Sequence, residues 1–344
     1  PRARLPLSPL PLSPLPLSPL RCLRGWFALG VGAGMVASIG ALPAALWAAP
    51  QPAAPDPALA ALLRSGDLSA LDGACTAALQ RGDGPQLRRL QQRLLTMHPA
   101  PQPLPVVLAN AHSLLSCGAP DGALQVLGRV SPAAGAERDQ WLMLQWRAAE
   151  LGLHHQLAAD ALERLAAGKL ASLASLELPV SQRQDGTRVT RPALDQLASH
   201  LESLGQRQRA AEVLVSSAQP GAATAARLSQ AVALLEGLPA PEQNRLLELA
   251  LEQAAASGSW GLVAQILDQQ LALTGSTPES AAWAERARER RLRLSGGIDD
   301  AYGEWLLRRR DPADPSRQSE LESQLRSPRS PGGHAAPPTP VSQP

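Results

Sequence analysis

The feature that most constrains the fold is a glycine flanked by the same apolar offsets at two places in the chain. Gly118 and Gly205 both have apolar residues eleven, seven and four positions before them and five and nine positions after them. These spacings follow one face of an α-helix on each side of the glycine. The pattern predicts a helix, a tight turn and a second helix, written twice. The residues are Val107, Ala111, Leu114, Ala123 and Leu127 around Gly118, and Leu194, Ala198, Leu201, Ala210 and Leu214 around Gly205.

The composition favours an all-α fold. Leu, Ala, Gln, Arg and Glu dominate the chain, and all are good helix formers. Aromatic residues make up only 3% of it, whereas sheets draw on aromatic and β-branched residues. We expect Ala111, Ala123, Ala198 and Ala210 to lie where paired helices touch, because small side chains let helix axes approach closely.

Apolar helical stripes continue over residues 57–310, which we predict to be one helical repeat domain. Glycines at 66, 82, 118, 152, 205 and 258 fit the turns between helices. The predicted helices cover residues 57–65, 68–81, 85–97, 104–117, 121–130, 133–151, 154–167, 191–204, 207–217, 222–236, 241–257, 260–273, 278–294 and 299–310.

One stretch interrupts this pattern, and the chain loses it altogether near its end. Asp185-Gly186 lies among polar and β-branched residues, so residues 178–191 are predicted to form a small hairpin or an exposed loop. From residue 311 to 344, Pro, Ser, Gly and Gln dominate, and we expect this tail to be disordered.

The repeat resembles the tetratricopeptide family. Gly118 and Gly152 are 34 positions apart, the period of that family, and Trp141 stands eleven positions before Gly152, where the family often has tryptophan. The small-then-large pair comes one position late after Gly152, and after Gly258 only Ala264 fits. The resemblance implies a right-handed superhelix of antiparallel hairpins, an α-solenoid with a concave groove, and it implies no catalytic residues.

The N-terminal region resembles an export signal behind a low-complexity arm. Residues 1–20 repeat LPLSP and are expected to be disordered, because proline excludes helix. Arg21 and Arg24 precede an uncharged run at 25–49, so residues 21–49 predict a secretory signal peptide or, if uncleaved, a membrane signal anchor. Residues 50–56 then form a linker. Both alternatives place the following domain in the periplasm of a bacterium, secreted or membrane-anchored.

Charge and cysteine content limit the classes of partner. Four arginines and no acids fall within residues 1–49, which leaves 28 basic and 30 acidic side chains in the remainder. A slightly acidic body is not typical of a nucleic-acid-binding protein. Cys75 and Cys117 match no metal or redox motif; two buried thiols and, after export, a disulfide are both open.

No catalytic, cofactor-binding or metal motif stands out. His154-His155 is the one adjacent histidine pair, but neighbouring helical residues point about 100° apart and no further ligand is placed nearby in sequence. The other histidines are scattered, and HExxH, CxxC, GxSxG and P-loop motifs do not occur. We therefore predict no cofactor, no metal, no catalytic residue and no small-molecule substrate. The scattered histidines are His98, His112, His200 and His334.

Two charged clusters near the end of the helical domain are candidates for a functional site. Acids and aromatics gather at Asp299, Asp300, Tyr302, Glu304 and Trp305, as in sugar-cleaving enzymes. The preferred interpretation is a terminal helix whose apolar stripe seals the last hairpin. Five arginines upstream have helical ion-pair spacing to glutamates and predict a solvated face. The stripe comprises Ile298, Tyr302, Trp305 and Leu306; the arginines are Arg286, Arg288, Arg290, Arg291 and Arg293.

These observations lead to one functional expectation and two alternatives. We expect a non-enzymatic scaffold, exported or membrane-anchored through residues 25–49, that binds a protein partner in the groove of a helical solenoid. The first alternative is a helical envelope enzyme that acts on glycans. The second is a cytoplasmic adaptor whose apparent leader results from a wrongly assigned start.

Overall fold

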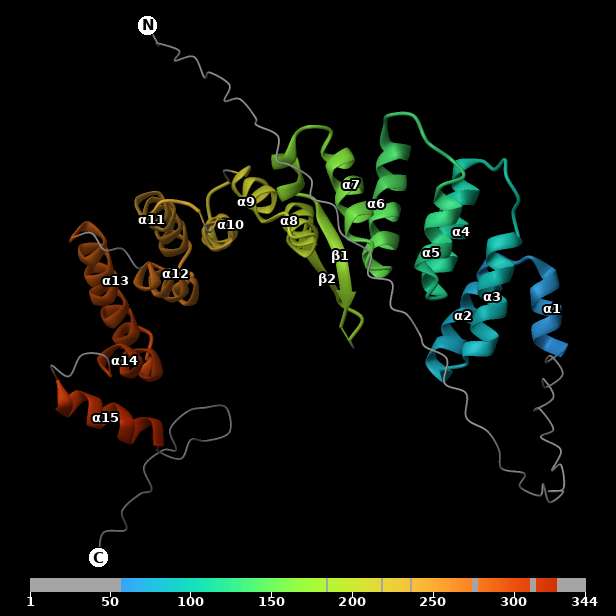
Figure 1. Ribbon diagram of the computed structural model, residues 1–344. Helices are drawn as coiled ribbons and strands as arrows, with labels where there is room; N and C mark the ends of the chain where they lie inside the picture. The colour runs from blue at the N-terminus through green and yellow to red at the C-terminus, as the bar shows by residue number, and fades with distance from the viewer. Residues whose placement is uncertain are drawn as a thin grey trace, which may run out of the picture. The chain divides into compact units, whose positions relative to one another are not determined.

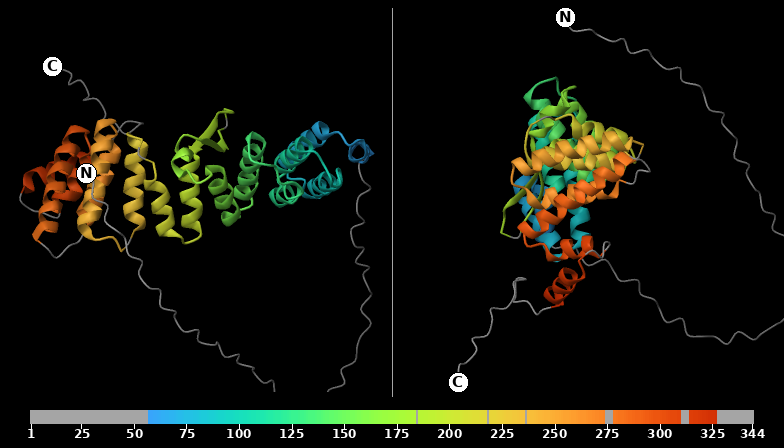
Figure 2. Two further views of the ribbon diagram at one scale, coloured as in Figure 1. Left: turned by 90° about the horizontal axis from the view of Figure 1, so that it is seen from above. Right: turned by 90° about the vertical axis from the view of Figure 1, so that its left-hand side faces the viewer.

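The computed structural model describes residues 57–183, 185–217, 219–235, 237–273, 278–309 and 314–326. This part of the chain holds fifteen α-helices, one 3-10 helix and two strands, and successive helices contact one another along it (Figures 1 and 2). The predicted arm, leader and linker at 1–20, 21–49 and 50–56 lie outside the described residues.

Every predicted helix is present, with ends within three residues of those expected, so the mostly helical fold is confirmed. The elements are α1 Pro57–Ser65, α2 Leu68–Arg81, α3 Gly84–Thr96, α4 Leu104–Ser116, α5 Pro120–Leu127, α6 Ala136–Leu151, α7 His155–Ala166, η1 Leu170–Ala174, β1 Glu177–Gln182, β2 Arg188–Pro192, α8 Ala193–Ser203, α9 Arg207–Val215, α10 Ala222–Leu234, α11 Ala240–Ala256, α12 Trp260–Ala272, α13 Pro278–Gly297, α14 Ala301–Arg308 and α15 Pro315–Arg326.

The same type of backbone turn recurs between six pairs of helices: α2 and α3, α4 and α5, α6 and α7, α8 and α9, α11 and α12, and α13 and α14. A residue in the left-handed conformation follows the first helix, and the next N–H reaches back to a carbonyl in the last turn of that helix. At Gly118 the φ angle is 66°, and the N–H of Ala119 donates to the carbonyl of Leu114 at 2.9 Å. This is a Schellman motif, and it reverses the chain within a few residues.

The turn after α6 explains the late pair in the sequence pattern. Gly152 has an ordinary φ of −86°, and Leu153 takes the left-handed position with a φ of 57°. Counted from Leu153, the pair Ala158 and Leu162 falls at the expected five and nine positions, and both are buried. The repeat is therefore intact here and shifted by one residue.

After Gly258 the sequence pattern matches only at Ala264, which is buried, yet the hairpin keeps the usual register. Val263 and Leu267 occupy the fifth and ninth positions after this glycine, and both are buried. A larger residue replaces the small one that we expected at the fifth position, so the register of the hairpin is kept. The residues at the preceding offsets are also buried: Leu247, Leu251 and Ala254.

The core consists of Leu and Ala side chains between successive helices, as the offsets predict. All ten residues at the offsets around Gly118 and Gly205 are buried, including the four alanines expected at helix contacts. The buried apolar residues form two clusters that meet at α10: Ala231 belongs to the cluster on its N-terminal side, and Ala225 belongs to the one on its C-terminal side.

The small hairpin, one of the two alternatives predicted for residues 178–191, is present as the strand pair β1 and β2. β1 pairs with β2 in antiparallel register, with Leu178 opposite Arg191 and an irregularity between Pro179 and Ser181. Asp185 Oδ1 accepts a hydrogen bond from the Thr187 N–H at 2.9 Å and so stabilises the tight turn. The hairpin is inserted between α7 and α8 and projects beyond the helices (Figure 1).

Cys75 on α2 and Cys117 at the end of α4 form a disulfide, which answers the question that the sequence left open. Their Cα atoms are 4.8 Å apart and both side chains are fully buried. The bridge closes a loop across a sequence separation of 42 residues and ties the first two hairpins together.

The expectation of a disordered tail from residue 311 is wrong for residues 315–326, which form α15. Asp314 caps this helix, since its Oδ1 accepts from the Arg317 N–H at 3.1 Å. Leu321 is fully buried, and Arg317 pairs with Glu304 at 2.8 Å. One apolar anchor and an ion pair order a segment that its composition alone describes as polar. Residues 311–313 and 327–344 lie outside the described residues.

No helix within the described ranges is long and apolar enough to span a bilayer.

Candidate partner-binding groove

An apolar hollow of about 460 Å³ lies between α4, α6 and the first strand of the hairpin; we call it the groove. Most of its surface is hydrocarbon, and polar side chains stand among the apolar ones. Met143 is half-buried there and can adapt to different side chains, because it is unbranched and polarisable. The lining residues are Leu108, His112, Gln140, Met143, Leu144, Trp146, Arg147, Glu177, Leu178 and Pro179.

The hairpin is fixed over the groove by one buried side chain and one guanidinium. Leu178 of β1 is 1% exposed, so it anchors the strand in the helical core. Arg147 of α6 donates from Nη1 to the carbonyl oxygen of Pro179 at 2.9 Å. The backbone N–H of Ala193, where α8 begins, donates to the carbonyl of Leu176 at 2.7 Å. The wall that β1 contributes is therefore held in place from both ends of the insertion.

A polar cluster lies beneath the groove, in contact with its Trp146. The indole Nε1–H of Trp146 donates to Nε2 of His200 on α8 at 3.2 Å. Nδ1 of His200 is 3.2 Å from Nδ1 of His155 at the start of α7. Glu150 on α6 places Oε2 3.2 Å from Nε2 of His200. We call these four residues the His200 cluster.

His200 is the enclosed titratable member of this cluster, with 3% of its surface exposed. Burial lowers the pKa of His200 below its ordinary value of 6.5, because the charged imidazolium loses solvation. The carboxylate of Glu150 opposes this and raises the pKa, while the neighbouring His155 lowers it again. Burial prevails, so His200 is neutral near pH 7.

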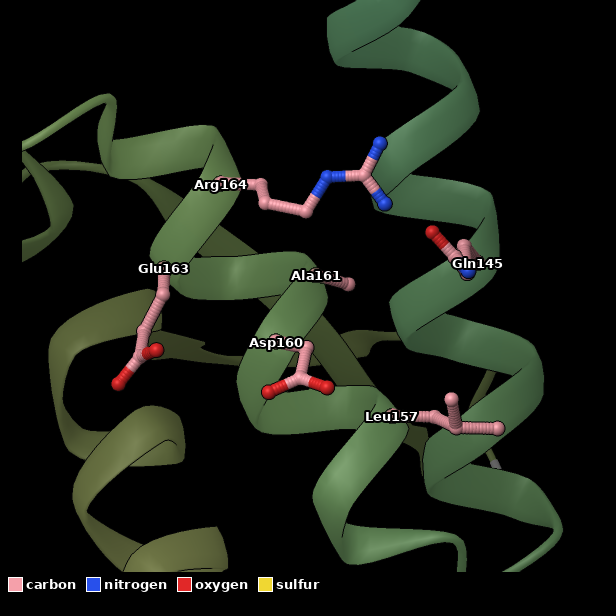
Figure 3. Close-up of a pocket in the computed structure, with 6 residues that line it drawn as sticks. All are labelled: Gln145, Leu157, Asp160, Ala161, Glu163 and Arg164. Carbon is pink, nitrogen blue, oxygen red and sulfur yellow. The ribbon is translucent and has the colours of Figure 1, made fainter. Parts of the chain in front are cut away.

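A second hollow, of about 400 Å³, lies between α6 and α7 (Figure 3). Gln145 projects from one helix toward Leu157, Asp160 and Arg164 of the other (Figure 3). Its charged groups already interact within the protein: Asp160 accepts from Gln156 at 2.7 Å, and the guanidinium of Arg164 lies 5.2 Å from the Trp141 ring. This hollow is more polar than the groove.

The histidine pair of the sequence is divided between two contacts. Nε2 of His154 lies 2.5 Å from Oδ1 of Asp121, whereas His155 faces His200. Within the described ranges no group of three or more metal-ligating side chains converges. The contact of His155 with His200 spans 45 positions of sequence, so spacing along one helix could not reveal it.

Two carboxylates of the acid–aromatic cluster, Asp300 and Glu304, are engaged in ion pairs. Asp300 binds Arg291 at 2.7 Å and accepts from the Gly303 N–H at 2.9 Å. Glu304 binds Arg308 and Arg317, both at 2.8 Å. These two carboxylates therefore have structural roles at the end of the helical array.

The predicted apolar seal of this terminal helix is wrong. Ile298, Tyr302 and Leu306 are exposed, and Tyr302 stacks on Trp305 at the surface. The buried face of α14 instead carries Ala301 and Glu304. Glu304 turns inward because two cationic side chains pair with it there, Arg308 of the same helix and Arg317 of α15.

The predicted solvated arginine face is only partly correct. Arg291 is 5% exposed and pairs with Asp268 at 3.1 Å as well as with Asp300. Arg290 pairs across helices with Glu248 at 2.9 Å. Arg293 has its expected intrahelical partner, Glu289, at 4.0 Å. A mixed charge pattern on one helix did not distinguish surface arginines from one that enters the core.

Comparison with known proteins gives no further guide: no protein-family model matches this sequence, and no curated protein matches it significantly.

Proposed function

We propose that this chain is a non-enzymatic scaffold that binds a segment of a partner protein in the groove. We further propose that its hairpins stack as a right-handed, tetratricopeptide-like superhelix, with support from the turn that recurs from α2 to α14. The domain would lie in the periplasm, secreted or anchored through residues 25–49. The disulfide between Cys75 and Cys117 supports an oxidising compartment, where such bonds persist.

The observation that carries the proposal is the apolar lining of the groove beside a fixed hairpin. Leu108, Met143 and Leu144 offer hydrocarbon surface to an inserted side chain, which is how partner proteins gain most of their binding energy. Arg147 and Glu177 at the same site provide one cation and one anion for the polar groups that flank such an anchor. A protein segment with an apolar side chain between polar neighbours fits this lining.

The groove is tested by placing a photo-crosslinking amino acid at position 143 in the full chain, expressed in its own cells. The protein joined to this position is identified, purified and titrated against the native chain. We expect Met143→Glu to raise the Kd at least tenfold, since a buried carboxylate loses its hydration without a partner.

Leu249→Glu is the matched control, because Leu249 is an exposed leucine on α11, away from the groove. It should leave the Kd and the melting temperature unchanged. Equal Kd values for the native chain and for Met143→Glu, at equal melting temperature, would contradict the groove as the binding site.

The location is tested by fusing alkaline phosphatase after residue 60, because this enzyme is active only where its disulfides form. We expect an active fusion. A fully expressed but inactive fusion would overturn the periplasmic location and favour the cytoplasmic adaptor.

A further inference from the structure

The hydrogen bonds of the His200 cluster define which nitrogen of His200 carries a proton in the neutral state. The Trp146 N–H needs an acceptor, and Nε2 of His200 supplies it at 3.2 Å. The proton of a neutral imidazole must then lie on Nδ1, where it can be donated to Nδ1 of His155 at 3.2 Å. Both bonds are satisfied together only while His200 is neutral.

Protonation of His200 removes this arrangement. Both ring nitrogens then carry hydrogen, so Nε2–H and the indole N–H of Trp146 become two donors that face each other. Glu150 offers an alternative acceptor, because its Oε2 already lies 3.2 Å from Nε2. The imidazolium therefore gains a carboxylate partner, and Trp146 loses its acceptor in a buried place.

The consequence reaches the groove because Trp146 belongs to its lining. An indole N–H without an acceptor is costly in the interior, so the ring is expected to turn away from His200. Three helices contribute residues to the His200 cluster: α6 carries Trp146 and Glu150, α7 carries His155, and α8 carries His200.

We propose that His200 is a proton-operated switch of the groove. When His200 takes up a proton, its Nε2 stops accepting from Trp146 and donates to Glu150 instead, and this change weakens partner binding. This inference rests on the proposed function, since it concerns the affinity of the same groove. The titratable groups that face His200 are Glu150 from α6 and His155 from α7.

The direction of the pH effect follows from linkage. Burial lowers the pKa of His200 below 6.5, so the switch operates on the acidic side of that value. A partner that binds the neutral form lowers this pKa further, and each unit of difference corresponds to a tenfold change in affinity. We expect partner binding to be about tenfold weaker at pH 5 than at pH 7.5.

The switch itself is tested without a partner, by NMR of the full chain with ¹⁵N-labelled tryptophan. The indole N–H signal of Trp146, identified through its loss in Trp146→Phe, should shift between pH 7.5 and 5 with the midpoint of the His200 ring signals. In His200→Gln, which retains a polar side chain that does not titrate, this shift should vanish. A Trp146 signal that stays fixed, or that shifts equally in His200→Gln, would overturn the switch.

His112→Gln is the matched control, because His112 is an exposed histidine of the groove. It should leave the pH-dependent shift of the Trp146 signal intact. Loss of this shift in His112→Gln would mean that His112, and not His200, causes it.

Partner affinity then separates the two proposals. Met143→Glu at pH 7.5 tests the groove with His200 neutral, whereas pH-independent binding by the native chain would overturn the link between proton uptake and affinity.

Discussion

The hairpins α4–α5 and α13–α14 have the same type of backbone turn, but the buried side chains beside it are apolar in the first hairpin and polar in the second. The residues in the left-handed conformation are Gly118, with φ 66°, and Asp299, with φ 56°, and the same backward hydrogen bond of 2.9 Å follows each. Four positions before the turn stands Leu114 in one hairpin and Ser295 in the other. Five positions after it stands an alanine in α5 and Glu304 in α14, and all of these side chains are buried.

This difference shows that the turn and the core are specified separately. The turn depends on backbone hydrogen bonds, which form with glycine, leucine or aspartate at the critical position. The core depends on which partners the neighbouring helices supply. In α13–α14 those partners are ionic: Arg291 donates to Ser295 at 2.5 Å and to Asp300 at 2.7 Å. Ion pairs that are partly buried return only a part of their desolvation cost, so we expect this hairpin to be the less stable.

The largest effect should come from truncating the matched position in each hairpin. Leu114→Ala removes a fully buried side chain and should lower the free energy of unfolding by about 2–5 kcal/mol. Ser295→Ala removes a hydroxyl that hydrogen-bonds Arg291 and should cost about 1 kcal/mol. Urea unfolding followed by circular dichroism measures both. Equal losses would mean that the two cores do not differ as proposed.

Much of the helical fold could be predicted from local spacing, because a buried helix face repeats with the period of the helix. The sequence predicts the turn after α6 at Gly152 and not at Leu153, because leucine rarely adopts a positive φ. The buried polar face of α14 was also missed, since Tyr302, Trp305 and Leu306 are more apolar than the residues that enter the core. Hydropathy alone cannot anticipate that Glu304 enters the core because Arg308 and Arg317 pair with it there.

The groove and the His200 cluster were beyond prediction for a different reason. Leu108, Met143 and Leu178 come from three elements, and they converge only once the hairpin has packed against α6. In the sequence His155 belongs to the pair with His154, and His200 stands alone. Their contact depends on how α7 and α8 pack. Local periodicity identifies which face of a helix is buried, but not which neighbour that face meets.

The second effect concerns how the two hairpins are secured. A disulfide ties α4 to α2, and the loop-closure argument assigns about 2–4 kcal/mol to such a bridge. Replacing both Cys75 and Cys117 with alanine should lower the free energy of unfolding by that amount. Dithiothreitol should destabilise the native chain similarly and leave the double variant unchanged. Hydrogen exchange in α13 and α14 should not respond, and acceleration there equal to that in α2 and α4 would remove the distinction between the two hairpins.

The smallest effect should come from the charge that holds α15 on the polar hairpin. The hydrogen bond from Arg317 holds the pKa of Glu304 below its ordinary 4.5, although burial acts in the opposite direction. Glu304 therefore contributes stability that is present above pH 4.5 and is lost as pH falls through its lowered pKa. Glu304→Gln keeps the shape of the side chain but removes its charge, and partly exposed ion pairs of this kind contribute about 1 kcal/mol. Amide hydrogens of α15 should then exchange about fivefold faster at pH 7.

Glu320→Gln is the matched control, because it removes the exposed partner of the same arginine. Added salt should loosen α15 in the native chain more than in Glu304→Gln, since screening weakens only a charged contact. Equal acceleration in the Glu304 and Glu320 variants would show that the buried carboxylate has no special part in docking α15.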